Sequence, residues 1–200
     1  MAHDRDVAAF DRRARTYDVG WRGRMHDQIT LRTVAQALKA APTATRVLDV
    51  GCGTGTALRL LSVRLPDARA VVGVDAAPGM VDVARTRTQS DERIEVRQGT
   101  AEHLPVDPGS FDLIVSITSF DHWSDQLAGL HSCAQALTGG GTLVLTDLFS
   151  PLLAPTLLAG RRGRARTVGA GTRLLRQAGF TSLRWDRGPL LSTVIATRPA

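Results

Sequence analysis

Residues 47–55 read Val47-Leu48-Asp49-Val50-Gly51-Cys52-Gly53-Thr54-Gly55, a short apolar run that leads directly into a glycine-rich turn. The run, together with Arg46, predicts a strand, and apolar residues at helical spacing in residues 56–65 predict a helix after the turn. Glycine lacks a Cβ, so a ligand can approach its backbone closely. Open α/β sheets bind ligands at the carboxyl ends of their strands, and we therefore expect this turn to be a ligand-binding loop.

The composition indicates one soluble domain. The chain has 200 residues, of which 43% are hydrophobic, enough for one sizeable core but not for two. Two cysteines, Cys52 and Cys133, predict neither a disulfide framework nor a metal cluster, so we expect a cytoplasmic, reducing location and no metal. The charged amino terminus and the lack of an apolar run near the roughly 20 residues of a membrane helix predict no membrane span.

The net charge of +6 is weak evidence for a nucleic-acid partner. Lys39 is the only lysine among the 25 basic residues. Such an excess of arginine reflects genomic base composition as much as nucleic-acid binding. Charge alone therefore identifies no partner.

Strands and helices alternate after the glycine turn. The patterns predict strands at residues 46–50, 71–75, 93–97, 111–117 and 142–147, and an antiparallel edge pair at 180–185 and 191–197. Helices are expected at residues 7–17, 25–41, 56–65, from Pro78 onward, at 124–137, and at 172–178 with Thr172 as its cap. In the helix at 25–41, the expected buried stripe is Leu31, Val34, Ala35 and Leu38.

A series of motifs follows one order along the chain. The segments are FDRRARTYD at 10–18, DVGCGTG at 49–55, VDAAPGM at 74–80, GTAEHLP at 99–105, SFDLIVS at 110–116, LTGGGTL at 137–143 and AGF at 178–180. Together they resemble the class I S-adenosylmethionine-dependent methyltransferases, of the methyltransferase domain 11 or ubiquinone/menaquinone-biosynthesis-like type. The resemblance covers nearly the whole chain.

The resemblance implies a Rossmann-like three-layer α/β/α sandwich. Its seven-stranded, mostly parallel sheet would have the order 3-2-1-4-5-7-6, with strand 7 antiparallel. One domain spanning residues 1–200 would comprise an N-terminal helical lid at 1–42, a cofactor-binding core at 43–147, a substrate-side insertion at 148–171, and a C-terminal helix and β-hairpin at 172–200. Two alternatives stay open, because the N-terminal helices could only cover the sheet edge and the insertion could be an exposed loop with a solvated arginine run.

The implied cofactor is S-adenosyl-L-methionine, with S-adenosyl-L-homocysteine as product. By the resemblance, Gly51, Cys52 and Gly53 lie under the methionine and ribose. Asp75 would accept the ribose hydroxyls, with helix capping as the alternative, and Asp49 would orient the loop or meet the ligand ammonium through water. The other implied contacts are Ala76 and Met80 on the adenine, Thr100, Ala101 and Glu102 at its edge, Ser116 near the sulfonium, and Tyr17 over the methionine moiety. Taken alone, Met80 fits a core position as well.

Two features of the motifs depart from related patterns. The family often has an aspartate where Thr100 stands, which weakens the expected contact to the adenine amino group. The glycine spacing G-x-G-x-G also differs from G-x-G-x-x-G, and this argues against a dinucleotide-binding loop that holds a pyrophosphate on a helix terminus.

Methyl transfer from a sulfonium needs no nucleophile on the enzyme, because the leaving group is already activated. Orientation can supply much of the catalysis, although a hydroxyl acceptor can need a base. Asp121 and His122, just after the fourth strand, are the candidate catalytic residues. A packing or loop-ordering role for His122 is the alternative.

The acceptor is expected to be a small, partly apolar molecule. Apolar residues at 148–158, together with Trp21 and Trp123, favour this class. The arginine run at 161–166 would suit an acidic substrate or RNA, but residues 116–120 lack the Asn/Asp-Pro-Pro-Tyr/Phe element of many base-amino methylases, so nucleic acid is the second choice. A non-catalytic protein that binds S-adenosylmethionine is a further alternative, and the oligomeric state is open.

Overall fold

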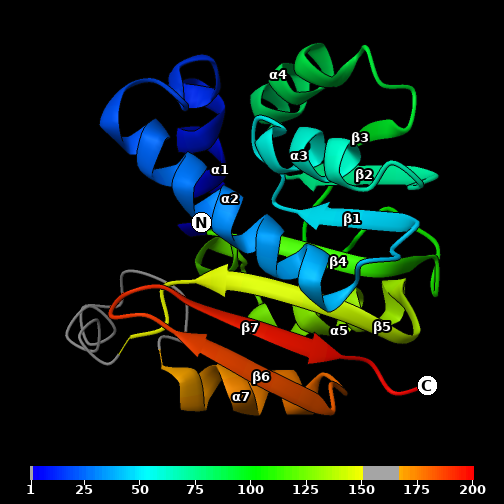
Figure 1. Cartoon of the computed structure of the whole chain (residues 1–200). Coiled ribbons are helices and arrows are strands. Elements are labelled where there is room, and N and C mark those ends of the chain that lie inside the picture. Colours follow the sequence, from blue (N-terminus) through cyan, green and yellow to red (C-terminus); the bar gives the residue numbers. More distant parts are fainter. Residues whose placement is uncertain (1, 151–166) are drawn as a thin grey trace.

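The centre of the fold is a seven-stranded sheet in the order β3-β2-β1-β4-β5-β7-β6 (Figure 1). The computed structural model describes residues 2–150 and 167–200. Strand β7 runs antiparallel to both of its neighbours, and the other neighbouring pairs are parallel. This confirms the predicted sheet. The strands are β1 Arg46–Val50, β2 Ala70–Asp75, β3 Ile94–Gln98, β4 Phe111–Ile117, β5 Leu137–Asp147, β6 Ser182–Arg187 and β7 Ser192–Thr197.

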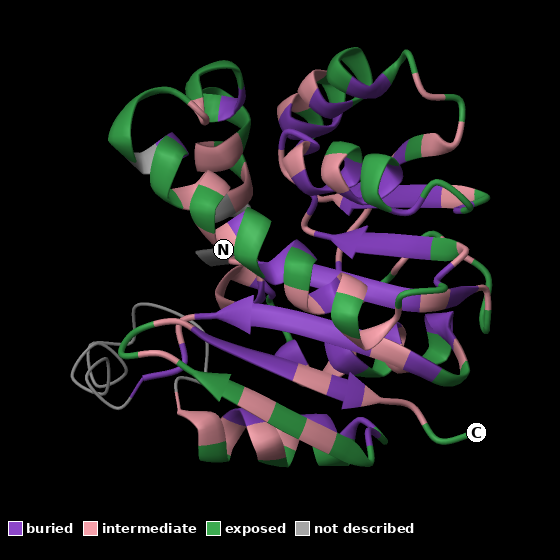
Figure 2. Cartoon of the chain, in the orientation of Figure 1, coloured by how far each residue is buried: buried purple, intermediate pink, exposed green. Residues whose placement is uncertain are grey.

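Helices cover both faces of this sheet, which confirms the three-layer sandwich. One apolar cluster joins α2, α3 and α4 to one face, and a second joins α5 and α7 to the other. The strands between them are almost wholly buried in Figure 2, apart from β3 and β6 at the edges, as expected for strands covered on both sides. The helices are α1 Ala2–Arg13, α2 Gly20–Ala40, α3 Thr56–Arg64, α4 Pro78–Thr88, α5 Gln126–Ala136 and α7 Val168–Gln177, with 3-10 turns η1 Ala14–Thr16 and η2 Phe120–His122.

Several boundaries differ from those predicted. The last helix begins at Val168 instead of residue 172, because the Oγ1 of Thr167 accepts a hydrogen bond from the Ala170 amide. Thr172 instead accepts one from the Trp185 indole. Strand β5 begins at Leu137 rather than residue 142, and its extra residues are accommodated by a shift of register against β4 between the pairs Phe111–Leu137 and Leu113–Thr142.

The buried face of α2 also differs from the predicted stripe. Leu31 is 42% exposed and Ala35 is exposed, whereas Thr30 and Thr33 are buried. The reason is a polar contact, because the Thr33 hydroxyl lies 2.8 Å from Thr146 Oγ1 on β5 while it donates to the Ile29 carbonyl within its own helix. The predicted substrate-side insertion at 148–171 lies mostly outside the described residues, which resume at 167.

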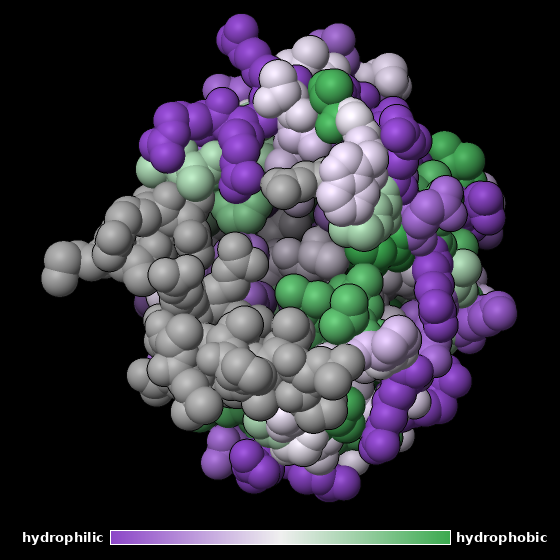
Figure 3. Space-filling view, turned by 90° about the vertical axis from the view of Figure 1, so that its left-hand side faces the viewer, coloured by the Kyte–Doolittle hydropathy of each residue, from purple (hydrophilic) through white to green (hydrophobic). Residues whose placement is uncertain are grey.

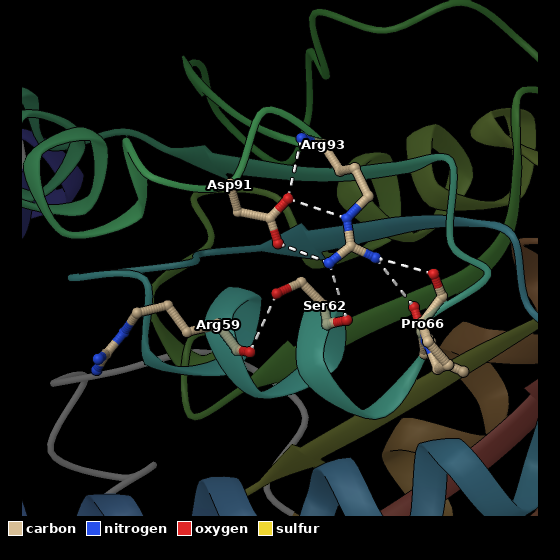
Figure 4. Close-up of polar contacts among 6 residues, drawn as sticks. Arg59, Ser62, Pro66, Asp91 and Arg93 are labelled. Atoms are coloured by element: carbon tan, nitrogen blue, oxygen red, sulfur yellow. Dashed lines mark hydrogen bonds and ion pairs between the residues drawn. The ribbon is translucent and has the colours of Figure 1, made fainter.

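The guanidinium of Arg93, just before β3, connects β3 to the end of α3 through hydrogen bonds (Figure 4). Arg93 donates to the carbonyls of Ser62, Leu65 and Pro66 at the end of α3, where the helix leaves carbonyls without helical partners. It also pairs with Asp91 at 2.7 Å, and this hydrogen bond lowers the pKa of Asp91 to about 2.

Among the described helices, none is both long and apolar enough to cross a bilayer.

Candidate functional site

A pocket lies at the carboxyl ends of β1, β2 and β4 and is closed on its outer side by α1, η1 and α2. Figure 3 views the molecule from this side, where hydrophobic atoms gather around a hollow near the centre. Eleven of the predicted site residues line the pocket: Tyr17, Gly51, Cys52, Gly53, Asp75, Ala76, Met80, Thr100, Ala101, Glu102 and His122. The structure therefore brings together segments that are far apart in the sequence.

The glycine loop presents bare backbone to this pocket. Gly51 and Gly53 have φ angles of +78° and +53°, which favour glycine. A Cβ on Gly51 would lie 2.3 Å from the Cβ of Ser119, whereas one on Gly53 would meet nothing within 4 Å. The amides of Gly51 and Cys52 both donate to the Val74 carbonyl, at 2.8 and 3.1 Å. The loop is thus held against β2, and Gly53 leaves open space above it.

Asp75 links the loop to the next helix. Its Oδ2 accepts from the Gly53 amide at 2.8 Å, and its Oδ1 accepts from the Ala77 amide at 2.9 Å, just before α4. Burial raises the pKa of Asp75, and the two amides oppose this shift. A carboxylate has about four acceptor positions, so these two bonds leave capacity for hydroxyl donors from a ligand. The capping alternative is therefore compatible with a binding role.

Side chains from α4 and from residues 99–102 line a further part of the pocket. Met80 is 2% exposed and packs in a small cluster with Ala14 and Ala77, so it is both a core residue and part of the wall. Glu102 is held by the start of α5, where it accepts from the Ser124 hydroxyl at 2.8 Å and the Asp125 amide at 3.0 Å. This part of the pocket therefore combines an apolar wall at Met80 with the polar side chain of Glu102.

Three predicted residues do not line this pocket. Ser116 is fully buried, and its Oγ lies 2.9 Å from the Oγ of Ser119, which does line the pocket. Asp121 lines a neighbouring cavity instead. Asp49 is 2% exposed and faces a third, small cavity under the glycine loop. Its pKa is raised to about 8, by burial first and by Asp75 second.

Aromatic rings close the pocket on the side of the N-terminal helices. The Tyr17 and His26 rings meet edge to face with centroids 5.5 Å apart, and the Phe10 and His122 rings do so at 4.9 Å. Phe10, His26, Ser119 and Thr118 were not predicted as site residues. Ser119 and Thr118 directly follow β4, so their place in the chain was the available signal.

Carboxylates of the N-terminal segment fasten this wall to the core. Asp11 Oδ1 accepts from the Gly79 amide at 2.6 Å, in the first turn of α4. Asp18 Oδ2 accepts from the Thr54 hydroxyl at 2.8 Å and also pairs with Arg87. The chain passes so closely here that a Cβ on Gly23 would lie 2.1 Å from the Asp18 carbonyl oxygen. The wall is therefore joined to both the glycine loop and α4.

A second cavity of about 520 Å³ adjoins the pocket and shares Phe10, Tyr17, His26, Thr118 and His122 with it. Trp21, Met25, Ile29 and Leu191 add an apolar lining, and Asp121 and Asp147 add carboxylates. Burial raises the pKa of Asp147 to about 6. Two adjoining cavities with a shared wall suit a reaction between two ligands.

Within the described residues, no cluster of three or more His, Cys, Asp or Glu side chains could hold a metal.

Parts of the chain are similar to known proteins. Residues 47–141 match a family described as "Methyltransferase domain". Over 140 residues, the chain is 36% identical to the ubiquinone biosynthesis O-methyltransferase of Xanthomonas campestris pv. campestris (strain B100), covering 68% of this chain and 57% of that protein. It is 31% identical over 113 residues to the ubiquinone/menaquinone biosynthesis C-methyltransferase UbiE of Geobacter sp. (strain M21), covering 55% and 48%.

The fold is likewise shared with solved structures. A putative methyltransferase of Haloferax volcanii, solved in complex with the Trm112 methyltransferase activator, superposes with a TM-score of 0.80 at 21% identity, covering 96% of this chain and 98% of that one. At this identity the likeness concerns the fold. The chain spans about half the length of the curated relatives above.

Proposed function

Because residues 47–141 match a family described as "Methyltransferase domain", we propose that the protein transfers a methyl group from S-adenosyl-L-methionine to a small-molecule acceptor. One observation carries the proposal. The Asp75 carboxylate accepts a hydrogen bond from the Gly53 amide, where the backbone is open to a ligand, and both residues line a pocket that shares a wall with a second cavity. The relatives' names support the reaction class.

The residues present fit the cofactor. We assign the ribose to Asp75, whose remaining acceptor positions suit a pair of hydroxyls. The adenine fits between Met80 with Ala76 and the segment of Thr100, Ala101 and Glu102. We assign the methionine part to the space over residues 51–53, below Tyr17, with Asp49 orienting the loop from the cavity beneath it. A cation near Asp49 would favour the ionised carboxylate, opposing the effect of burial.

When bound, the cofactor supplies a methyl group on a positively charged sulfur, and the protein's own residues orient and enclose it. Effective molarities of roughly 10⁵–10⁸ M are available from orientation alone. The Ser119 hydroxyl lies 2.9 Å from the Ser116 hydroxyl and donates to the Val50 carbonyl at 2.9 Å. These bonds hold the segment after β4 against β1. The rings of Phe10, Tyr17 and His122 line both cavities and so lie at the boundary between them.

We assign acceptor binding to the second cavity and its proton removal to His122, with Asp121 beside it. His122 lines both cavities, and Asp121 lines only the second. The apolar lining suits a ring-bearing acceptor, and the relatives named for ubiquinone biosynthesis make phenols and quinols the first compounds to test. The N-terminal segment would act as a lid, because Asp11 and Asp18 fasten it to the core near the pocket. We also propose a cytoplasmic location.

Turnover decides this proposal. Release of S-adenosyl-L-homocysteine should be measured with a panel of phenols, quinols and amines. We expect turnover with at least one phenol or quinol, and a slower rate with an altered pH profile in His122→Ala. An unchanged rate and profile would remove His122 from the chemistry. Tight cofactor binding without turnover on any acceptor would instead favour a non-catalytic binding protein. The RNA alternative concerns residues 161–166, which lie outside the described residues.

A further inference from the structure

Three buried polar atoms converge beneath the glycine loop. They are Nδ1 of His26, Oγ1 of Thr30 and Oδ1 of Asp49, and none has a hydrogen-bond partner within the described parts of the chain. All three residues line the same cavity of about 20 Å³ between α2 and the end of β1. An unpaired buried polar atom costs about 1–3 kcal/mol, so three around one cavity need an explanation.

The conformation of Thr30 is itself informative. Threonine within a helix commonly donates to the carbonyl four residues earlier, and Thr33, Thr86 and Thr88 all do so here. Thr30 is 1% exposed and makes no such bond. Its hydroxyl is therefore available to the cavity, where His26 joins it from one turn earlier on the same helix face.

His26 connects this cavity to the other two. Its Nε2 lies 3.1 Å from Oγ1 of Thr118, whose φ of +52° is the only positive value at a described non-glycine residue. The His26 ring also packs against Tyr17 and lines the cofactor pocket and the acceptor cavity. Burial lowers the pKa of His26, so at neutral pH the ring is uncharged and one nitrogen can accept while the other donates.

We propose that the cavity is a binding site for one water molecule, which hydrogen-bonds to His26, Thr30 and Asp49 and makes His26 a positioning residue for the cofactor pocket. A cavity of about 10–15 Å³ suffices for a water, provided that it has two to four polar partners. Water donates twice and accepts twice, so it satisfies all three atoms in either tautomer of His26. The site joins α2 to Asp49, directly below the glycine loop.

Stability of the free protein tests the water site without any cofactor. Thr30→Val keeps the shape but removes the hydroxyl, and Thr30→Ser keeps the hydroxyl. If a water bridges the three groups, Thr30→Val should lower the Tm by about 2–4 °C, because the water and its partners lose a hydrogen bond, and Thr30→Ser should lower it less. If no water binds, removing an unpaired buried hydroxyl should raise the Tm, and that result would overturn the proposal.

A crystal structure at high resolution supplies the direct view. We expect one density peak within hydrogen-bond distance of all three atoms. Side chains that bond to one another directly, or no peak between them, would contradict the site. The pKa of Asp49, followed by carboxyl ¹³C NMR, should rise in Thr30→Val because the ionised form loses solvation. Asp75, whose charge also raises the pKa of Asp49, should be followed in the same spectra, and His26 by its ring proton signals.

The positioning role of His26 rests on the proposed function and needs a separate pair of variants. Asn places a polar atom near the position of Nδ1, whereas Gln places one near Nε2. If the contact to the water positions the pocket, His26→Gln should weaken S-adenosylmethionine binding about tenfold more than His26→Asn. If His26→Asn weakens binding more than His26→Gln, the contact of Nε2 with Thr118 positions the pocket, and the proposed role of the water contact is wrong. A wild-type protein that binds no cofactor would refute the proposed function, while the Tm comparison would still judge the water site.

Discussion

Replacing Gly53 by alanine separates the fold of the glycine loop from its use as a binding surface. The φ of +53° at Gly53 places any side chain in the left-handed region, which costs roughly 1–2 kcal/mol. The added Cβ meets nothing within 4 Å in the protein, so no clash adds to this cost. For a chain of this size we expect the Tm to fall by roughly 2–8 °C, with the fold intact.

The effect on ligand binding should be much larger, because the new methyl group enters the space in which the cofactor would contact the protein backbone at Gly53. Forcing a methyl group into a filled space typically costs about 1–3 kcal/mol, which corresponds to a loss of affinity of roughly 5- to 150-fold. Isothermal titration calorimetry with S-adenosylmethionine measures this directly. Gly109→Ala is the matched control, since Gly109 has a φ of +62°, no atom within 4 Å of its Cβ, and a place before the amino-terminal end of β4, the end opposite to the pocket.

The two variants should therefore lose similar stability and differ in affinity. If Gly53→Ala binds the cofactor within twofold of the wild type, the ligand does not approach this backbone. The assignment of the methionine and ribose to the loop would then be wrong.

Three further results follow from the described contacts. Asp75→Asn should weaken cofactor binding roughly 30-fold, through loss of charged hydrogen bonds, while Asp82→Asn on the exposed face of α4 should not; equal calorimetric affinities would show that the ribose lies elsewhere. Asp49→Asn should change the pH dependence of stability. The folded protein keeps a proton on Asp49 up to about pH 8, whereas the unfolded chain loses it near pH 4; the wild type therefore loses stability as pH rises across this window, by up to about 1.4 kcal/mol per pH unit, and the variant does not. Urea unfolding at pH 5, 6.5 and 8 checks this, and parallel curves would count against a buried neutral carboxyl. Arg93→Gln should raise the pKa of Asp91 toward its ordinary value. Because that pKa is depressed in the folded state, the pair stabilises the protein above about pH 4 and ceases to do so as pH falls through about 2, so the loss of Tm should be larger at pH 7 than at pH 2; equal losses would indicate that only the helix carbonyls matter.

The strands could be predicted because their patterns are local and strong, and their order followed from the family resemblance. Residues 111–117 form β4 as expected, since the run is nearly continuous in apolar residues and both faces are covered. The cap of α7 could not be placed in the same way, because Thr167 and Thr172 both satisfy the capping preference. Only the contact between Thr172 and the Trp185 indole distinguishes them, and it depends on β6.

The position of the glycine loop was predictable to the residue, but the wall opposite it was not. The glycine spacing and Asp75 lie within one strand–turn–helix unit and the strand after it, so their proximity follows from the chain itself. His26 and Ser119 reach the pocket through tertiary packing. The buried face of α2 is similar, because Thr30 and Thr33 look like solvent-facing residues until the polar atoms they face are known.

Binding of S-adenosylmethionine and S-adenosylhomocysteine to the wild-type chain, measured by isothermal titration calorimetry, tests the central claim most directly. We predict one site per chain for each compound, competition between the two, and no competition from a nicotinamide dinucleotide. No heat of binding at millimolar concentrations of either compound would contradict the assignment of this pocket to the cofactor.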